Sequence, residues 1–196
     1  MRKTVFSLCF TLLTTLSFAF EKDFGHLSIS DGLSQMSVVS IAQDTDGYMW
    51  FGTRDGLNRY DGKEFKIFRN DIEDTLSISD NYIKVLIKDP KGGLWIGTAG
   101  GLNYYDNISE SFTRFFINPG QRTGNINEIN SLCLLEENLL IGTYRGLYIL
   151  RDNLIEKFPE FDNLPREDAI ATALIVYLPI GRTELSNYGP EDKKNV

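Results

Sequence analysis

A short string that returns at a fixed interval constrains the fold of this chain more than any other feature. Trp-Phe-Gly-Thr at 50–53 recurs 45 residues later as Trp-Ile-Gly-Thr at 95–98, and after another 45 residues as Leu-Ile-Gly-Thr at 140–143. A Gly-Leu pair follows each string at the same distance. Because these landmarks share one register, the chain is an internal repeat. The signature residues of the repeat are Trp50, Gly52, Thr53, Gly56, Leu57, Trp95, Gly97, Thr98, Gly101, Leu102, Gly142, Thr143, Gly146 and Leu147.

Each unit contains the pattern of four short strands joined by tight turns. In the first unit we expect strands at 38–42, 48–53, 57–60 and 64–68, and in the second at 82–87, 94–98, 102–105 and 112–116. The first of these, Val38 to Ala42, is almost continuously apolar, which is typical of an inner strand buried on both faces. Four strands in about 45 residues make the blade of a β-propeller. The sequence therefore predicts an all-β fold of four-stranded antiparallel blades, with three recognisable repeats and the start of a fourth.

The signature residues suit the packing of blades side by side around an axis. Trp50 and Trp95 are expected to fill the wedges between neighbouring blades, where an indole buries about 150–250 Å². Gly52 and Gly97 are expected where a side chain would obstruct the close approach of backbone near the axis. The third unit has Leu140 in place of tryptophan, and we expect a weaker blade there.

The first 19 residues have the features of a secretory signal peptide. Arg2 and Lys3 precede a short apolar stretch from Val5 to Leu16, and Ser17-Phe18-Ala19 supplies a small-x-small cleavage pattern. The alternative is an uncleaved anchor, although the stretch is short and rich in Ser and Thr for a membrane span. We therefore expect export, with cleavage near Ala19.

Charge and cysteine content exclude several classes of protein. The chain has 20 Lys and Arg against 27 Asp and Glu, a net charge of −7, whereas a nucleic-acid binder carries a basic face. We expect no nucleic-acid contact. After removal of the signal peptide one cysteine remains, Cys133, so the fold has no intrachain disulfide. Its apolar neighbours indicate a small buried hydrophobe.

The strings at 46–61 and 92–98 resemble the two-component regulator propeller repeat, and Asp-Gly-Leu-Ser at 31–34 matches the lead-in of that family. The resemblance covers about residues 24–161. It implies a periplasmic sensor region at the N-terminus of a hybrid histidine kinase, in which many repeats precede a β-sandwich, a membrane helix and a cytoplasmic kinase. It also implies an inner-membrane parent protein and a response to glycan fragments.

The repeats suggest a division of the chain into three parts. Residues 1–19 form the signal peptide, and residues 20–162 a partial propeller with repeats at about 33–76, 77–123 and 124–162. Residues 24–30 are expected to be a closing strand, and 163–196 the start of a fourth repeat that runs into an atypical tail.

The number of blades leaves two alternatives open. Three blades are recognisable and at most four fit the length, whereas a propeller typically needs at least four and members of this family usually have more. We therefore expect an exposed apolar blade face and an unpaired edge. The partners expected there are the remaining blades of a larger sensor or a second copy of the chain. Either the chain is a fragment of that sensor, or it is a small protein that assembles its blades.

No motif in the chain predicts catalysis or a cofactor. The phosphate-loop, zinc-protease and hydrolase motifs are absent from the sequence, and its one histidine, His26, has no second His or Cys beside it. Asp44-x-Asp46-Gly47 is similar to half of a calcium loop, but the matching turn at 89–92 carries a lysine, so a plain turn is favoured. We expect no enzyme activity, no catalytic residue, no metal and no cofactor.

Two further features were weighed for saccharide chemistry. Acidic pairs such as Asp55/Asp61 and Glu73/Asp74 fall in turns, where charge is expected without a glycosidase role. Tyr60, Tyr104 and Tyr105 have two alternative roles, stacking on sugar rings or packing between blades. Packing between blades is favoured.

Three functions remain in view. The first is a ligand-sensing input region of a histidine kinase, with a possible oligosaccharide ligand. The alternative is an exported propeller module that binds glycan or protein with no kinase attached. A third hypothesis, an exported lyase or hydrolase, is less well supported by the sequence. The sequence identifies no ligand-binding residue.

Overall fold

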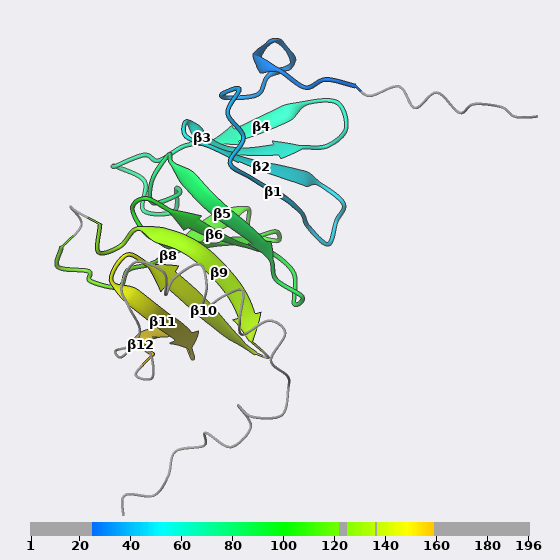
Figure 1. The fold of residues 1–196 in the computed structure, drawn as a ribbon. Coiled ribbons are helices and arrows are strands. Elements are labelled where there is room, and N and C mark those ends of the chain that lie inside the picture. Colours follow the sequence, from blue (N-terminus) through cyan, green and yellow to red (C-terminus); the bar gives the residue numbers. More distant parts are fainter. Residues whose placement is uncertain (1–24, 122–124, 136, 159–196) are drawn as a thin grey trace, which may run out of the picture.

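The computed structural model describes residues 25–121, 125–135 and 137–158, and these form three four-stranded antiparallel sheets that lie side by side (Figure 1). Each sheet is a meander in which consecutive strands are neighbours. Blade 1 contains β1 Ser40–Gln43, β2 Met49–Thr53, β3 Gly56–Tyr60 and β4 Phe65–Phe68; blade 2 contains β5 Ile83–Lys88, β6 Leu94–Thr98, β7 Leu102–Asp106 and β8 Ser111–Phe115; and blade 3 contains β9 Ile129–Leu135, β10 Asn138–Thr143, β11 Gly146–Arg151 and β12 Leu154–Lys157. The predicted all-β fold of four-stranded blades is confirmed.

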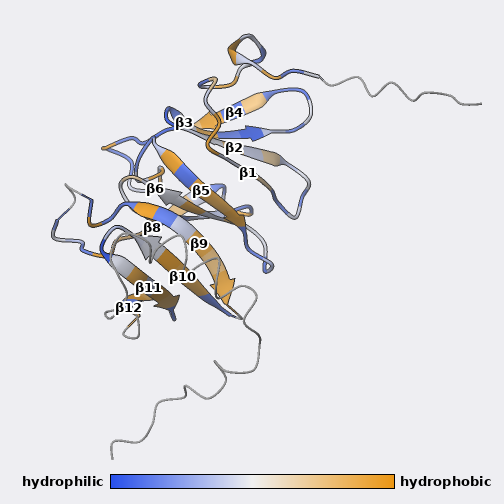
Figure 2. Cartoon of the chain, viewed as in Figure 1, coloured by the Kyte–Doolittle hydropathy of each residue, from blue (hydrophilic) through white to orange (hydrophobic). Residues whose placement is uncertain are grey.

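The strands occur where the hydropathy pattern predicts them, within two residues at each end. Apolar residues lie on the strands, and the turns between them are hydrophilic (Figure 2). A two-residue hairpin joins β11 to β12 through Asp152 and Asn153, both at positive φ. Asp and Asn tolerate that conformation better than other non-glycine residues, which allows a two-residue turn.

Blade 2 presents one face to blade 1 and the other to blade 3. A cluster of buried residues joins blades 1 and 2 and includes Trp50, Ile83 and Tyr105. A second cluster joins blades 2 and 3 and includes Leu102, Ile129 and Leu150. The core is therefore a series of junctions between sheets, because a single four-stranded sheet cannot bury both of its faces.

Glycine at the signature position permits this packing. A Cβ atom on Gly52 would lie 2.6 Å from Cγ2 of Ile83 in the next blade, and one on Gly97 would lie 2.7 Å from Cγ2 of Ile129. Both distances are well inside van der Waals contact, since apolar carbons prefer separations of about 3.5–4.0 Å. The inner strand of one blade thus approaches the backbone of the previous one, as the sequence predicted.

A polar network also repeats from blade 1 to blade 2. Asn58 Oδ1 accepts a hydrogen bond from the backbone of Ser34 at 2.8 Å, and the Ser34 hydroxyl lies 2.9 Å from that of Thr53. Asn103, Ser79 and Thr98 make the same contacts at 2.9 Å. Because these side chains are mostly buried and paired, the network fixes the entry into blades 1 and 2 without leaving its polar groups unsatisfied.

The outer face of blade 1 differs from the prediction for 38–42. The expected inner strand, buried on both faces, is only half covered: Ile41 is 56% exposed and Val39 47% exposed. No described sheet precedes blade 1, so no neighbouring blade covers Ile41 and Val39, although Gly32 lies close to Phe65 on the same face. An apolar face is exposed here, as expected from the blade number.

The segment at 24–30 is expected to be the closing strand of the last blade of a closed propeller, and the three described sheets do not test this prediction. Ile29–Asp31 is a short 3₁₀ helix, η1, and residues 25–28 pair with no strand of the three sheets. A strand pairs its backbone groups with a neighbour, and none of the described strands pairs with this segment.

Several predictions concern residues outside the described ranges. These are the signal peptide at 1–19 and the fourth repeat and tail at 163–196. Within the described ranges, no helix has both the length and the apolar character needed to cross a bilayer.

Candidate inter-blade binding site

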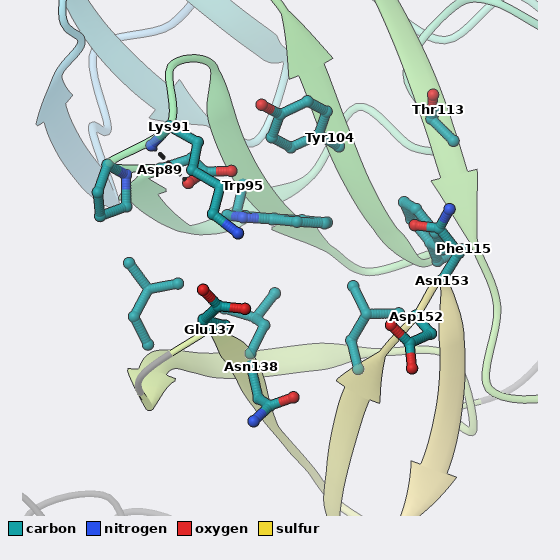
Figure 3. Close-up of a pocket in the computed structure, with 14 residues that line it drawn as sticks. Asp89, Lys91, Trp95, Tyr104, Thr113, Phe115, Glu137, Asn138, Asp152 and Asn153 are labelled. Carbon is teal, nitrogen blue, oxygen red and sulfur yellow. Dashed lines mark hydrogen bonds between the residues drawn. The ribbon is translucent and has the colours of Figure 1, made fainter.

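A cavity of about 800 Å³ opens between blades 2 and 3, at the end where the β5–β6, β9–β10 and β11–β12 hairpins turn (Figure 3). Its volume is within the range of small-molecule binding pockets. The lining combines aromatic, aliphatic, acidic and amide side chains, contributed by Asp89, Pro90, Lys91, Trp95, Tyr104, Thr113, Phe115, Leu134, Glu137, Asn138, Leu139, Leu150, Asp152 and Asn153.

Three aromatic rings form one wall. Trp95 on β6 lies 4.6 Å, centroid to centroid, from the ring of Tyr104 on β7 and 5.7 Å from that of Phe115 on β8. These residues share a face of blade 2 because Trp95 pairs with Tyr104, and Leu102 of the same face pairs with Phe115. Trp95 is only partly buried, so its indole is available as a flat apolar surface.

Polar side chains surround this wall. Asp89 and Lys91 come from the β5–β6 turn, Glu137 from the β9–β10 turn and Asp152 from the β11–β12 turn, and Asn138 is the first residue of β10. Asp89 Oδ1 accepts a hydrogen bond from the Lys91 backbone at 3.0 Å, which shapes the first of these turns. Three carboxylates therefore face one lysine around the aromatic wall.

The Tyr104 hydroxyl is held neutral in this setting. Burial, together with the nearby Asp89 carboxylate, raises the pKa of Tyr104 to about 12. The hydroxyl donates a hydrogen bond to the Gly92 carbonyl. Tyr104 thus braces the β5–β6 turn over the Trp95 ring and carries no charge at neutral pH.

The cavity exists because blade 3 substitutes smaller side chains at two positions. On the face of blade 2 that contacts blade 1, Tyr105 pairs with Phe112 across β7 and β8. At the same register in blade 3, Leu150 pairs with Ile155. Two aliphatic side chains replace two aromatic ones, which leaves space next to Trp95.

The structure assigns different roles to the tyrosines considered for sugar stacking. Tyr105 is fully buried between blades 1 and 2, where packing was favoured. Tyr60 stacks on Phe65 at 4.7 Å on the outer face of blade 1. Only Tyr104 lines the cavity.

The signature residues lie at the junctions or at the turns between β strands. Trp50 fills the first junction and Trp95 borders the cavity in the second, and Leu140 belongs to a third apolar cluster on the far face of blade 3. Thr53, Thr98 and Thr143 each donate to the carbonyl three residues on, at Gly56, Gly101 and Gly146. Leu57, Leu102 and Leu147 are buried, and Gly142 pairs with Leu147 across β10 and β11.

The acidic residues weighed for metal or acid–base chemistry serve turns and ion pairs. The Asp44 carboxylate is buried and accepts hydrogen bonds from the Tyr48 backbone and, at 2.7 Å, from Trp50 Nε1. Asp55 pairs with Arg69 at 2.9 Å, which lowers the pKa of Asp55. Within 25–121, 125–135 and 137–158 no group of three or more His, Cys, Asp or Glu side chains could hold a metal. Burial raises the pKa of the Cys133 thiol.

Sequence reasoning missed most of the polar lining, including Asp89, Glu137 and Asp152. Each belongs to a turn, where acidic residues need no functional explanation. A signal was nevertheless present: alignment of the repeats at their 45-residue interval places Leu150 under Tyr105, and this loss of volume predicts a cavity.

Residues 32–55 and 77–100 match the family model described as two component regulator propeller. These two segments are similar to two component regulator propeller repeats. The two matches include β1 and β2 of blade 1 and β5 and β6 of blade 2, which hold the signature tryptophans.

The propeller repeats are similar to sensor proteins. Histidine kinase P4 of Formosa agariphila is 63% identical over 49 residues, 25% of this chain and 4% of that protein. The extracellular domain of the hybrid two component system BT3049 from B. thetaiotaomicron has a TM-score of 0.61 at 30% identity, and the match covers 68% of this chain and 20% of that one. The extracellular domain of BT4673, with a TM-score of 0.56 and 22% identity over 71% of this chain and 18% of that one, supports the fold alone.

The relatives are thus a histidine kinase and extracellular domains of two-component systems. The matches cover only a small part of the length of each relative, 20% or less.

Proposed function

We propose that this chain is the extracytoplasmic input region of a two-component sensor histidine kinase, and that it responds to an oligosaccharide in the periplasm. The observation that carries the proposal is the cavity beside Trp95 in a fold shared with extracellular domains of hybrid two-component systems. The cavity lies between blades 2 and 3, so a ligand bound there would touch both blades.

The chemistry of the cavity suits a sugar ring. The C–H face of a pyranose is apolar and packs on a flat aromatic ring such as that of Trp95. Its equatorial hydroxyls point outward, where the carboxylates of Glu137 and Asp152 and the amide of Asn153 accept or donate hydrogen bonds. A pocket with one aromatic platform and several converging polar groups fixes both the orientation and the identity of its ligand.

We further propose that these residues bind without catalysis. The carboxylates at the cavity come from turns. Among the described residues, none of them is paired with a nucleophile or a base in the geometry that catalysis requires. Kinase activity would reside in another part of the sensor.

Binding is tested by screening the purified chain against a glycan array and titrating the best ligand by calorimetry. Trp95→Ala removes the platform and is expected to weaken binding at least tenfold. Tyr60→Ala, which removes an aromatic side chain from the outer face of blade 1, is the matched control and should leave affinity unchanged. If no glycan binds, or if Trp95→Ala binds as the parent does, the proposal is wrong.

Export is tested separately by fusing residues 1–30 to alkaline phosphatase, which is active only outside the cytoplasm. We expect an active fusion, and we expect Leu12→Arg, which interrupts the apolar stretch, to abolish activity. An inactive parent fusion would contradict the periplasmic location without affecting the binding result.

The outer face of blade 1 supports a protein partner, either a further blade of the sensor or a second copy. Ile41 and Phe51 pair across β1 and β2 at the register of Leu86 and Ile96, which contact the preceding blade. Sedimentation equilibrium distinguishes these two partners. A dimer that Ile41→Arg converts to a monomer indicates a second copy of the chain. If both the unsubstituted chain and the variant are monomers, the partner is a further blade of the sensor.

A further inference from the structure

We propose that the cavity between blades 2 and 3 selects neutral or amino sugars and rejects acidic ones such as uronates and sulfated residues. The inference rests on the proposed function, because it names which saccharides the same site takes. It follows from the charges around Trp95 and from the absence of an ion pair to any of the three carboxylates among the described residues.

The three acidic side chains reach the cavity from three separate hairpins. Asp89 lies on the β5–β6 turn, Glu137 on the β9–β10 turn and Asp152 on the β11–β12 turn (Figure 3). Because the hairpins belong to two blades, their charges surround the aromatic wall instead of lining one edge of it. Lys91 is the one cation among the lining residues, which leaves a net charge of −2 at neutral pH.

These charges are not neutralised inside the protein. The ion pairs found among the described residues are Arg59–Glu110, Lys66–Glu110, Arg69–Asp55 and Lys84–Glu128, and none uses a carboxylate of the cavity. The neighbouring Tyr104 hydroxyl donates to the Gly92 carbonyl and also lies beside the Asp89 carboxylate, and because it is neutral it does not offset that charge. The field in the cavity is therefore negative, and a ligand on Trp95 experiences it directly.

The sign of the ligand's charge decides the outcome. A carboxylate about 6 Å from one of these side chains loses roughly threefold to a hundredfold in affinity, depending on whether the effective dielectric constant is that of water or of a protein surface. A neutral sugar avoids this loss and donates its hydroxyls to the carboxylates in charge-assisted hydrogen bonds. An amino sugar gains a favourable ion interaction in addition.

The test uses a glycan array that contains neutral, amino and uronic or sulfated members of the same skeletons. We expect binding to neutral or amino members at least tenfold tighter than to their acidic counterparts. Equal or tighter binding of the acidic members overturns the selectivity and leaves the proposed function intact. If no glycan binds, the proposed function fails, and this inference with it.

A charge-neutral cavity supplies the mechanistic test. The double variant Glu137→Gln and Asp152→Asn keeps the size of both side chains, and asparagine tolerates the positive φ of 47° at position 152. We expect it to reduce the preference against acidic sugars at least tenfold. The double variant Glu73→Gln and Asp74→Asn makes the same change of net charge at exposed positions away from the cavity and should leave the preference unchanged.

Salt provides a second readout that a change of shape would not produce. The preference of the parent chain should diminish between 50 and 500 mM NaCl, roughly as the Debye length shortens from about 14 to about 4 Å. If the double cavity variant keeps the full preference, or if the control shifts it equally, the carboxylates are not its origin and the inference is wrong.

Discussion

The two junctions between the blades are built from the same repeat, yet one is closed and the other open. At the first, Trp50 is fully buried and packs edge-on against Tyr105 at 4.8 Å, with Phe68 stacked on it at 5.7 Å. At the second, Trp95 occupies the equivalent position but is partly exposed at the cavity. The difference comes from the following blade, which supplies Tyr105 and Phe112 in one case and Leu150 and Ile155 in the other.

Polar contacts follow the same division. Arg59 crosses the first junction to the Tyr105 hydroxyl at 3.0 Å and to Glu110 at 2.9 Å, on the longer turn between β7 and β8. At the second junction Tyr104 replaces Arg59, and the β11–β12 turn has only two residues. A propeller can therefore make either a core or a binding site at one register by changing a few side chains and the length of one turn.

Among the variants that test the difference between the two junctions, Trp50→Ala is expected to change the free energy of unfolding most. It removes a buried indole and leaves the Asp44 carboxylate without its indole donor, and we expect a loss of about 3–5 kcal/mol in the free energy of unfolding. Trp95→Ala, its matched partner, should lose about 1–2 kcal/mol because its ring is partly exposed already. Urea denaturation of both variants measures the difference. Equal losses would mean that the second junction is closed as well.

The next effect concerns the region near the axis, where the two junctions are alike. Gly52→Ala and Gly97→Ala each place a methyl group against an isoleucine of the next blade, and we expect each to cost about 1–3 kcal/mol. Gly25→Ala has open space and serves as the control. If only Gly52→Ala is destabilising, the junctions differ along their whole depth, not only at the cavity.

Filling the cavity should convert the second junction into a copy of the first. Leu150→Phe restores an aromatic ring at the register of Tyr105, and we expect saccharide binding to be lost with a change in unfolding free energy of less than about 1 kcal/mol. Calorimetric titration and urea denaturation together test this. Retained binding would show that the ligand does not enter the space beside Trp95.

The smallest effect concerns the ion pairs that cover the first junction. Hydrogen bonds from Lys66 and Arg59 lower the pKa of Glu110 in the folded state. The unfolded state therefore binds more protons in the acidic range, so this contribution to stability is present above the unfolded pKa and is lost as the pH falls through the folded pKa.

Glu110→Gln should accordingly lower the urea midpoint slightly at pH 7 and leave it equal to that of the unsubstituted chain once the pH is low enough to protonate Glu110 in the folded state. Glu73→Gln is the control, since its carboxylate is exposed and its removal should change neither value. A difference that persists at low pH would assign the effect to packing instead of charge.

The sequence alone determined the fold and the order of its parts. A period of 45 residues, alternating turns and short apolar strands specify four-stranded blades, because each property depends on residues close together in the chain. The same pattern placed Trp50 and Gly52 at a junction correctly. It overestimated the burial of Val38 to Ala42, since the cover of a blade face depends on whether another blade follows or precedes it.

Only the tertiary structure decided which junction is filled and which is open. Whether Trp95 is core or platform depends on Leu150 and Ile155, which lie more than 50 residues further along the chain and reach it through the packing of one sheet on another. The convergence of Asp89, Glu137 and Asp152 has the same origin. The turns that carry these residues become neighbours because hairpins of successive blades end at one edge. A local sequence pattern does not show which charged residues will lie close together in space.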